Sequence, residues 1–244
     1  MSLLERLNHA FTRQLPVKRV RSRLRSPVAS FTFDDFPQSA WTAGGPLLDR
    51  YGAKGTYYTA GSHCGTVEDE LLSFNAEDLR AVHAAGHEIA CHTFSHRRSP
   101  QVASADLEAD FDRNTAFLRG LLGDVALESF AYPYGSVSPR TKRLAGRRFP
   151  SSRGIRAGVN AGTLELAQLK AVPLEVREWS AEMVERLVER ARQRSGWIIF
   201  FSHDISESPS PYGATPAMLE HALATVRSAG IDILPVRDAL ARAV

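Results

Sequence analysis

The sequence predicts one α/β domain in which strands and helices alternate, in the manner of a TIM-barrel-like (β/α) barrel. Short runs rich in β-branched and aromatic residues alternate with helical patterns throughout residues 27–244, without a linker or a low-complexity break. One run, WIIFF at 197–201, is entirely apolar, which is typical of a strand buried on both faces of a parallel sheet. Seven or eight parallel strands in roughly 220 residues fit a closed or nearly closed barrel better than an open doubly wound sheet, although periodicity alone does not separate the two.

In the first half of the domain, the expected elements have clear ends. In chain order they are a strand over 28–33, a helix over 45–50, a strand over 56–59, a helix over 76–85, a strand over 87–91 and a helix over 104–122. Asn75 is placed to cap the second of these helices, with Asp78 three residues on. Gly52, Gly86 and Gly123 end the three helices, because glycine accepts the left-handed backbone found there.

The second half continues the same alternation. The expected elements are a strand over 129–132, a helix over 139–148, short strands over 152–155 and 171–175, a helix over 182–193, the strand 197–201, a helix over 216–229 and a strand over 231–236. Pro139 and Pro216 suit the first position of a helix, where no backbone N–H is needed. Residues 182–193 repeat apolar side chains at helical spacing and predict an amphipathic helix.

Residues 1–26 are predicted to form a basic N-terminal arm, separate from a single domain over 27–244. The arm holds seven Lys and Arg residues and one acid, so the remaining 218 residues carry a net charge of −3. This distribution argues against a nucleic-acid partner. The arm has neither the apolar segment nor the cleavage site of a secretory signal, so the expected compartment is the cytoplasm. The pattern favours a solvated helix or a partly disordered tail over contact with an anionic membrane surface.

Several classes of protein are excluded by composition. Cys64 and Cys91 form no C-x-x-C pair, which excludes a disulfide scaffold and a cysteine-rich zinc module. The longest apolar runs are far shorter than the roughly 20 residues that a membrane-spanning helix needs. No phosphate-binding P-loop and no dinucleotide fingerprint are present.

Polar and titratable residues follow four of the predicted strands. They are Asp34 and Asp35, His92 and His96, the turn Pro133-Tyr134-Gly135, and Ser202-His203-Asp204. In a parallel barrel the carboxyl ends of the strands meet at one rim, so these groups are expected to lie together.

His92 and His96 are spaced to bind one metal ion. Residues four apart lie on one face of a helical turn, so both imidazoles can reach a single cation. A carboxylate then completes a two-histidine, one-carboxylate set with positions open to water and substrate. Of Asp34 and Asp35, one would bind the metal and the other would accept a proton from an activated water. Surface histidines and an Asp-Asp turn are the alternative interpretation, and the convergence of four strand ends favours the metal site.

Four motifs then suggest a family. TFDD at 32–35, HTFSH at 92–96, YPYG at 132–135 and FFSH at 200–203 resemble, in the same order, the motifs of the polysaccharide deacetylases, the NodB-homology carbohydrate esterases. The resemblance spans about residues 28–240. It implies a distorted (β/α) barrel and the metal-dependent removal of an N-acetyl group from an amino sugar.

The resemblance also implies a role for each matching residue. Asp35, His92 and His96 resemble the metal ligands, which usually hold Zn²⁺ in this family. Asp34 resembles the catalytic base. Tyr134 resembles the residue whose backbone N–H stabilises the oxyanion, and His203 resembles the general acid that protonates the leaving amine.

Three departures from the family pattern concern supporting residues. Phe36 stands where the first motif usually has Gly, and Ala131 stands where an Arg usually holds the catalytic Asp. We hypothesise that Arg153, at the end of a predicted strand, reaches Asp34 instead. The Asp that orients the acid histidine has no clear match, and the acids that could replace it are Glu175, Glu178 and Asp204.

The expected partner is a carbohydrate substrate carrying an N-acetylated amino sugar. Trp179 and Tyr212 are candidates to stack on sugar rings, although burial in the core is the commoner fate of Trp. The loop over 206–216 either walls a substrate groove or is a plain connection. Two other functions stay open: a hydrolase of another non-peptide C–N bond, such as a small amide or cyclic ureide, and a non-catalytic sugar-binding relative.

Overall fold

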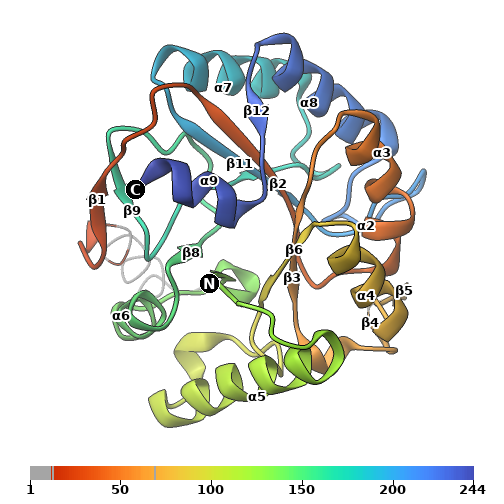
Figure 1. Cartoon of the computed structure of the whole chain (residues 1–244), viewed down its shortest axis with the longest axis vertical. Coiled ribbons are helices and arrows are strands. Elements are labelled where there is room, and N and C mark those ends of the chain that lie inside the picture. The colour runs from red at the N-terminus through yellow and green to blue at the C-terminus, as the bar shows by residue number, and fades with distance from the viewer. Residues whose placement is uncertain (1–11, 13, 69) are drawn as a thin grey trace.

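The computed structural model describes residues 12, 14–68 and 70–244, and its main sheet is seven parallel strands curled into a half-barrel (Figure 1). In spatial order the strands are β10 (Val172–Pro173), β11 (Trp197–Ser202), β2 (Val28–Phe33), β3 (Thr56–Thr59), β6 (Glu88–Cys91), β7 (Ser129–Ala131) and β8 (Ser151–Arg153). An eighth short strand, β12 (Asp232–Ile233), pairs with β2. The predicted parallel α/β fold is therefore confirmed, as a distorted and incompletely closed barrel.

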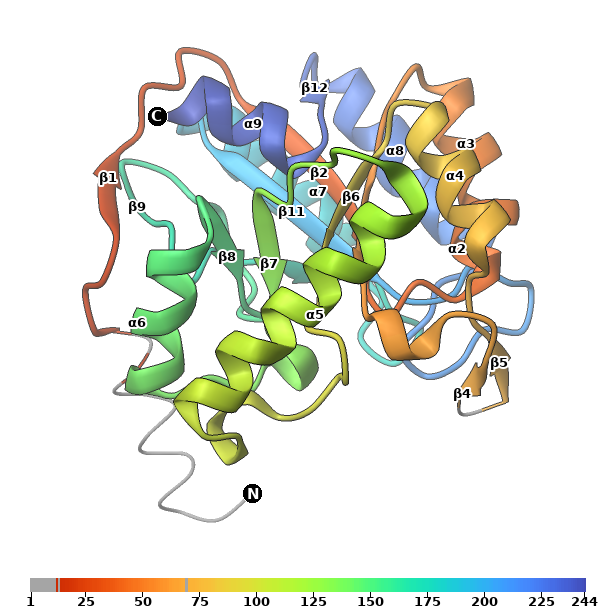
Figure 2. The same cartoon turned by 60° about the horizontal axis from the view of Figure 1, so that its bottom comes forward.

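Helices cover the outer face of this sheet (Figures 1 and 2). They are α2 (Gln38–Thr42), α3 (Gly44–Arg50), α4 (Ala76–Ala84), α5 (Ser104–Leu122), α6 (Pro139–Arg148), α7 (Ala181–Gln193) and α8 (Pro216–Ser228). Three short 3-10 turns, η1 (Gly61–His63), η2 (Ser99–Gln101) and η3 (Pro133–Gly135), lie in loops after strands. Two small antiparallel pairs complete the chain, β1 (Arg19–Arg21) with β9 (Thr163–Glu165), and β4 (Val67–Glu68) with β5 (Leu71–Leu72). None of the helices in the described ranges is long and apolar enough to cross a membrane.

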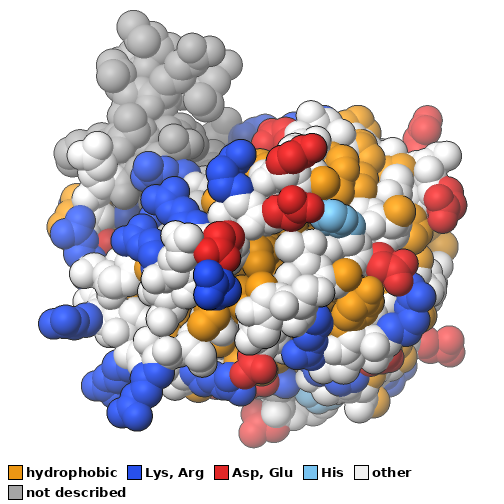
Figure 3. All heavy atoms as spheres, turned by 90° about the horizontal axis from the view of Figure 1, so that it is seen from above, with side chains coloured by type: hydrophobic (Ala, Val, Ile, Leu, Met, Phe, Trp, Pro, Cys, Tyr) orange, Lys and Arg blue, Asp and Glu red, His pale blue; other side chains and the backbone are white. Residues whose placement is uncertain are grey.

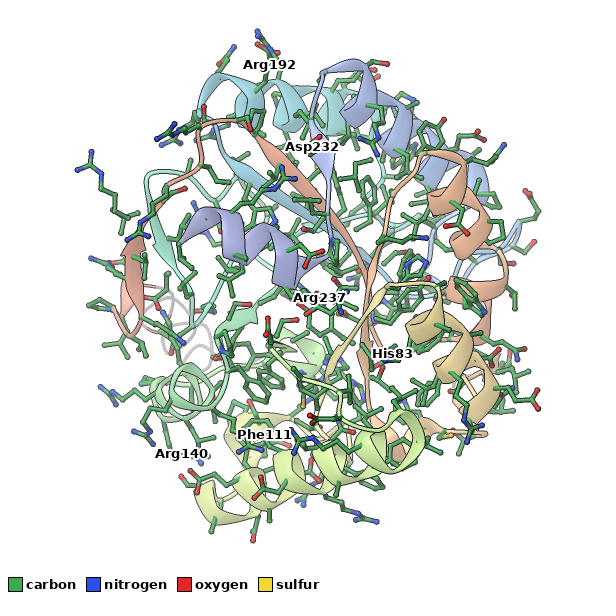
Figure 4. All side chains as sticks on the ribbon, viewed as in Figure 1. His83, Phe111, Arg140, Arg192, Asp232 and Arg237 are labelled. Atoms are coloured by element: carbon green, nitrogen blue, oxygen red, sulfur yellow. The ribbon has the colours of Figure 1, made fainter. Side chains whose placement is uncertain are left out.

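The last helix, α9 (Val236–Ala243), closes the amino-terminal end of the half-barrel. Its first two backbone N–H groups donate to Thr56 Oγ1 and to Glu88 Oε2, both at 2.9 Å. The Glu88 carboxylate also accepts from Ser129 Oγ at 2.5 Å. Figure 4 shows Arg237 at the start of this helix, near the middle of the view. Burial raises the pKa of Glu88. Because these contacts fill the amino-terminal end of the half-barrel, its open end is the carboxyl end of the strands.

Apolar side chains fill both faces of the central strands. On one face Phe31 stacks on Phe200, with ring centroids 5.0 Å apart, against the helices of the outer layer. On the other face Val28 and Trp197 belong to a second cluster that includes Leu240 of α9. Every residue of β2 and β11 is buried, and for β11 the continuous apolar run 197–201 predicted this.

Most predicted elements match the structure at or near their expected bounds. β2, β3, α5 and α6 have the predicted limits. Asn75 caps α4 through a capping box with Asp78, in which each side chain accepts from the other residue's backbone.

Several elements differ from the prediction, and three of them matter most for the fold. The strand predicted over 231–236 is shorter, at Asp232–Ile233 (β12). It is followed by α9, which was not predicted, and in which Val236, Ala239, Leu240 and Ala243 repeat at helical spacing and are buried. The helix α2 was not predicted. Within the basic arm, Arg19–Arg21 form a strand rather than a solvated helix or tail, held by pairing with β9. Residues 1–11 and 13 of the predicted arm lie outside the described residues.

The surface charge is uneven on the face that Figure 3 shows. Lys and Arg side chains gather toward the left of the view, whereas acidic, basic and hydrophobic side chains are mixed over the rest. On this face the positive charge is therefore concentrated on one side.

Candidate metal centre

Three side chains from two strand ends converge at the open end of the half-barrel. Asp35 follows β2, His92 directly follows β6, and His96 lies four residues after His92 in an irregular loop, not on the predicted helical turn. Asp35 Oδ1 lies 2.9 Å from His96 Nε2 and 3.3 Å from His92 Nε2. One potential ligand atom of each residue lies within 4.8 Å of the other two. The structure thus brings together the three residues predicted to bind a metal.

The chemistry of this donor set fits a divalent cation. His92 Nδ1 lies 2.8 Å from the carbonyl oxygen of Ala131, which can only accept, so Nδ1 carries a hydrogen and Nε2 is the ring nitrogen turned toward Asp35. Burial opposes charge on His92, but the Asp35 carboxylate raises its pKa. Burial also opposes charge on Asp35, but hydrogen bonds with His92 and His96 hold its pKa well below its usual range. The cluster therefore favours a positive charge between its members, as a bound metal would supply.

Strained backbone accompanies the site residues. Asp35, Phe36, Thr93, His96 and Tyr134 all have positive φ, between 48° and 62°, in the left-handed region that favours glycine. Consecutive strand residues point to opposite faces, so the turn after β2 is what lets two adjacent aspartates serve one site.

At Phe36, aromatic packing compensates for a strained backbone conformation. Its φ of 55° explains why glycine is the usual residue at this place. Its buried ring stacks on Phe74 at 5.0 Å and packs on Tyr57 at 4.7 Å. The aromatic contacts thus offset the unfavourable backbone conformation that the departure from glycine introduces.

Asp34 pairs with Arg153 in the interior. Arg153 Nη2 donates to Asp34 Oδ1, and both side chains are almost completely buried. The guanidinium lies between the rings of Tyr58 and Phe201, at 4.8 and 5.0 Å from their centroids. Burial opposes the charge of Arg153, but the charge and the hydrogen bond of the Asp34 carboxylate favour it. The pKa of Arg153 is therefore raised. Arg153 therefore contacts Asp34, as the hypothesis from the sequence requires.

The strand register explains how Arg153 takes this place. Ala131 of β7 is the direct partner of Arg153 on β8. The position where the family usually has its arginine is thus adjacent, across one strand pair, to the arginine that this chain uses.

His203 faces the cluster from the end of β11. Its Nε2 lies 3.8 Å from Asp35 Oδ2, and its Nδ1 lies 3.2 Å from the carbonyl oxygen of Tyr212. The carbonyl fixes Nδ1 as the donor and leaves Nε2 toward the site. The contact that orients His203 is therefore a backbone atom, which no side-chain motif in the sequence reveals.

The three acids considered as orienting groups have different surroundings. Asp204 accepts from the backbone N–H and the hydroxyl of Ser210, at 2.9 and 2.5 Å, and so shapes its own loop. Glu178 is largely exposed. Glu175 is buried beside the site and accepts from Arg177 Nε at 2.5 Å. Burial raises the pKa of Glu175, and of the three it is the acid that lines the cleft with His203.

The metal cluster opens into a cleft of about 880 Å³. Tyr134 is 53% exposed there, with its ring centroid 4.6 Å from that of His96. Tyr212 is 48% exposed and packs on His203 at 5.6 Å. The loop after His203 therefore forms part of the cleft wall, rather than a plain connection.

Two findings change the predicted lining of the cleft. Trp179 does not line the cleft. Its ring packs edge-on against His221 of α8, with ring centroids 5.7 Å apart, and against the core. This corrects its assignment to substrate binding, because the ring packs on the core and on α8 and does not face the cleft. Arg98 and Arg177 do line the cleft and were missed. For Arg98 a signal was available, since it follows the predicted ligand His96 by two residues.

Comparison with known proteins identifies relatives. The family described as polysaccharide deacetylase matches residues 21–148. A search of curated proteins gives no significant match. Among solved structures, the chain is similar to a family 4 acetyl xylan esterase from Clostridium thermocellum in complex with a cobalt ion. They share 22% identity and a TM-score of 0.61 over 86% of this chain and 89% of that one.

Two further structures share the fold. A peptidoglycan N-acetylglucosamine deacetylase is 15% identical, with a TM-score of 0.62 over 89% of this chain and 90% of that one. A family 4 pseudoenzyme from Bacillus anthracis is 11% identical, with a TM-score of 0.61 over 94% of this chain and 71% of that one. At these identities the likeness concerns the fold alone.

Proposed function

This chain belongs to the polysaccharide deacetylase family, and we propose that it is a metal-dependent hydrolase that removes an N-acetyl group from an amino sugar. The observation that carries the proposal is the pairing of two units in one cleft. One unit is the Asp35, His92 and His96 cluster, and the other is the buried pair of Asp34 and Arg153. The cleft has the size of a small-ligand site, which suits one or more sugar units.

Asp35, His92 and His96 would hold the metal, for which Zn²⁺ is the first choice given two imidazoles and one carboxylate. When bound, such a cation polarises the scissile carbonyl and makes water more acidic. The cleft side of the cluster is open, so substrate can approach it.

The remaining steps belong to residues of the chain. Asp34 accepts a proton from the attacking water, and Arg153 fixes the orientation of its carboxylate. The backbone N–H of Tyr134 is the donor to the developing oxyanion. His203 gives a proton from Nε2 to the leaving amine nitrogen, while the Tyr212 carbonyl holds its other nitrogen. Water thus loses one proton to the base, and the amine gains one from the acid.

The test is acetate release from an N-acetylglucosamine oligomer by the zinc-loaded protein and by Asp34→Asn. General base catalysis typically contributes about 10²- to 10⁴-fold, so we expect a rate loss of at least 100-fold with an unchanged metal content. Asp49→Asn is the matched control, because Asp49 is exposed and pairs with Lys54 at the surface. Equal rates for Asp34→Asn and wild type would contradict the assigned base.

A substrate panel separates the alternatives. Turnover of a small amide or a cyclic ureide, with no acetate released from any amino sugar, would indicate the other C–N hydrolase. Metal binding and sugar binding without any turnover would indicate a non-catalytic relative. The complete set of Asp34, Asp35, His92, His96 and His203 around one cleft supports the enzyme.

A further inference from the structure

We infer that the substrate carries a negatively charged group, a carboxylate or a phosphate, and that Arg98 binds this group at the mouth of the cleft. The inference rests on the proposed function, because it names the class of amino sugar that the same cleft accepts. It makes Arg98 a residue that determines substrate specificity.

Arg98 is held in position by an aromatic ring. Its guanidinium carbon lies 4.1 Å from the ring centroid of Tyr134, and the Tyr134 ring in turn packs on the metal-site residue His96. Stacking on a ring face fixes a guanidinium while leaving the N–H groups on its edge available to donate. The arginine is exposed and lines the cleft, so these donors face the space that a substrate would fill.

The charge of Arg98 is not neutralised by the parts of the chain that the structure describes. Within those residues no acidic side chain forms an ion pair with it. The two other arginines at the site differ in this respect. Arg153 is paired with Asp34, and Arg177 is paired with Glu175 and also lies 4.0 Å from Glu178.

The cleft as a whole therefore favours an anion. The charges of the Asp34–Arg153 pair and of the Glu175–Arg177 pair cancel. The two positive charges of a divalent cation on the metal ligands would exceed the single negative charge of Asp35. Arg98 adds a further positive charge. Field lines concentrate in a cleft with low-dielectric walls, so a charge of one sign attracts ligands of the other.

The geometry also limits which part of the substrate is charged. Arg98 lies beyond Tyr134, one ring removed from the metal ligand His96. The anion is therefore on a substituent or a neighbouring unit, and not on the acetamido group that would meet the metal. A guanidinium fork matches carboxylate and phosphate equally in its pair of parallel N–H donors.

The experiment compares binding by calorimetry and acetate release on the zinc-loaded full chain. The probes are N-acetylglucosamine, N-acetylglucosamine 1-phosphate and N-acetylmuramic acid, with inorganic phosphate as the baseline for direct contact with the metal. The variants are Arg98→Gln and Arg98→Lys. Arg97→Gln is the matched control, because Arg97 is also exposed but does not line the cleft.

We expect wild type and Arg97→Gln to bind at least one charged sugar about tenfold more tightly than the neutral one, as charge-assisted hydrogen bonds allow. Arg98→Gln should lose this preference, because glutamine has no charged fork to bind the anion. Arg98→Lys should keep part of it. Which charged sugar is preferred distinguishes phosphate from carboxylate.

Equal affinity for neutral and charged sugars, no detectable binding of any of the three, or an equal effect of Arg97→Gln would overturn the inference. The proposed function fails separately. In that case no sugar releases acetate, even though the charged sugar still binds through Arg98.

Discussion

At the scale of single residues, the pairing of Asp34 with Arg153 depends on a small neighbour. Ala131 and Arg153 are direct partners on adjacent parallel strands, so their side chains leave the sheet on the same side. Ala131 is fully buried in a small cluster with Tyr58 and Ala90. An alanine at this place leaves room inside the barrel for the long side chain of Arg153.

Replacing Arg153 tests this arrangement. Arg153→Ala should lower the rate of acetate release about 100-fold. Without its positioning partner the Asp34 carboxylate can shift, and a displacement of about 1 Å can cost that factor in rate. Metal content, measured by mass spectrometry, should stay at the wild-type value since Arg153 touches no metal ligand. Breaking a buried ion pair can cost about 3–5 kcal/mol of stability, so thermal unfolding must be measured alongside.

Arg153→Lys provides the second arm. It keeps the charge but not the planar fork, and we expect an intermediate rate with a more nearly normal unfolding temperature. A folded Arg153→Ala protein with full turnover would show that Asp34 needs no such partner.

Residue by residue, the sequence predicted the groups that chemistry demands. Two histidines and one of the two aspartates follow from residue type and strand ends, because carboxyl ends of parallel strands share one rim. The choice of Asp35 as the ligand, and the hypothesis that Arg153 contacts Asp34, also needed the resemblance to the family. The Tyr212 carbonyl that orients His203 was not predictable, since every residue has a carbonyl. Trp179 was misplaced because residue type does not tell a buried Trp from one in a groove.

At the scale of elements, His87 joins three of them at the start of β6. Its Nδ1 accepts from the backbone N–H of Gly55, just before β3, at 2.9 Å. Its ring packs edge-on against Trp41 of α2 at 5.4 Å and Tyr57 of β3 at 5.6 Å. The acceptor role and the apolar surroundings both require a neutral ring.

This junction predicts how stability depends on pH. Burial lowers the pKa of His87 from 6.5 to about 4. Because the folded protein binds the proton less readily than the unfolded chain, the stabilisation is fully present above pH 6.5 and is lost as the pH falls toward 4. His87→Asn keeps an acceptor for Gly55 but does not titrate.

Urea unfolding of wild type and His87→Asn at a series of pH values checks this prediction. The variant should be less stable at neutral pH, because it loses the ring contacts. The difference between the two proteins should shrink as the pH falls through the window. A constant difference from neutral pH to pH 4 would show that His87 does not titrate as its burial indicates.

The elements were predictable where local signals agree. Caps, prolines and glycines marked α4, α5 and α6, and buried runs marked β2 and β11. The strand β1 was not predictable, because its residues taken alone indicate a basic tail. The strand forms by pairing with β9, which lies more than a hundred residues away in the sequence. Tertiary pairing of this kind leaves little trace in local sequence.

At the scale of the whole molecule, the half-barrel separates stability from chemistry. Its base is closed by α9 and by the contacts of Glu88, whose two carboxylate oxygens both accept hydrogen bonds. Its open end carries five of the seven described non-glycine residues with left-handed backbone, together with the convergent metal ligands and the cleft. Strain concentrated at one end of a well-packed fold is typical of a functional site.

Metal binding should therefore stabilise the open end and be visible in the stability of the whole chain. A ligand at a thousand times its dissociation constant adds about 4 kcal/mol to the folded state. For a domain of this size each kcal/mol shifts the unfolding temperature by about 2–4 °C. Wild type reconstituted with Zn²⁺ should contain about one equivalent by mass spectrometry and unfold roughly 10 °C above the chelator-treated protein.

His92→Ala should lose both the metal and the shift in unfolding temperature, because it removes one of the three ligands. His221→Ala is the matched control, since this histidine lies on α8 against Trp179. A wild-type protein that takes up no metal after reconstitution, and unfolds at the same temperature with and without chelator, would remove the cation from the reaction and with it the proposed deacetylase.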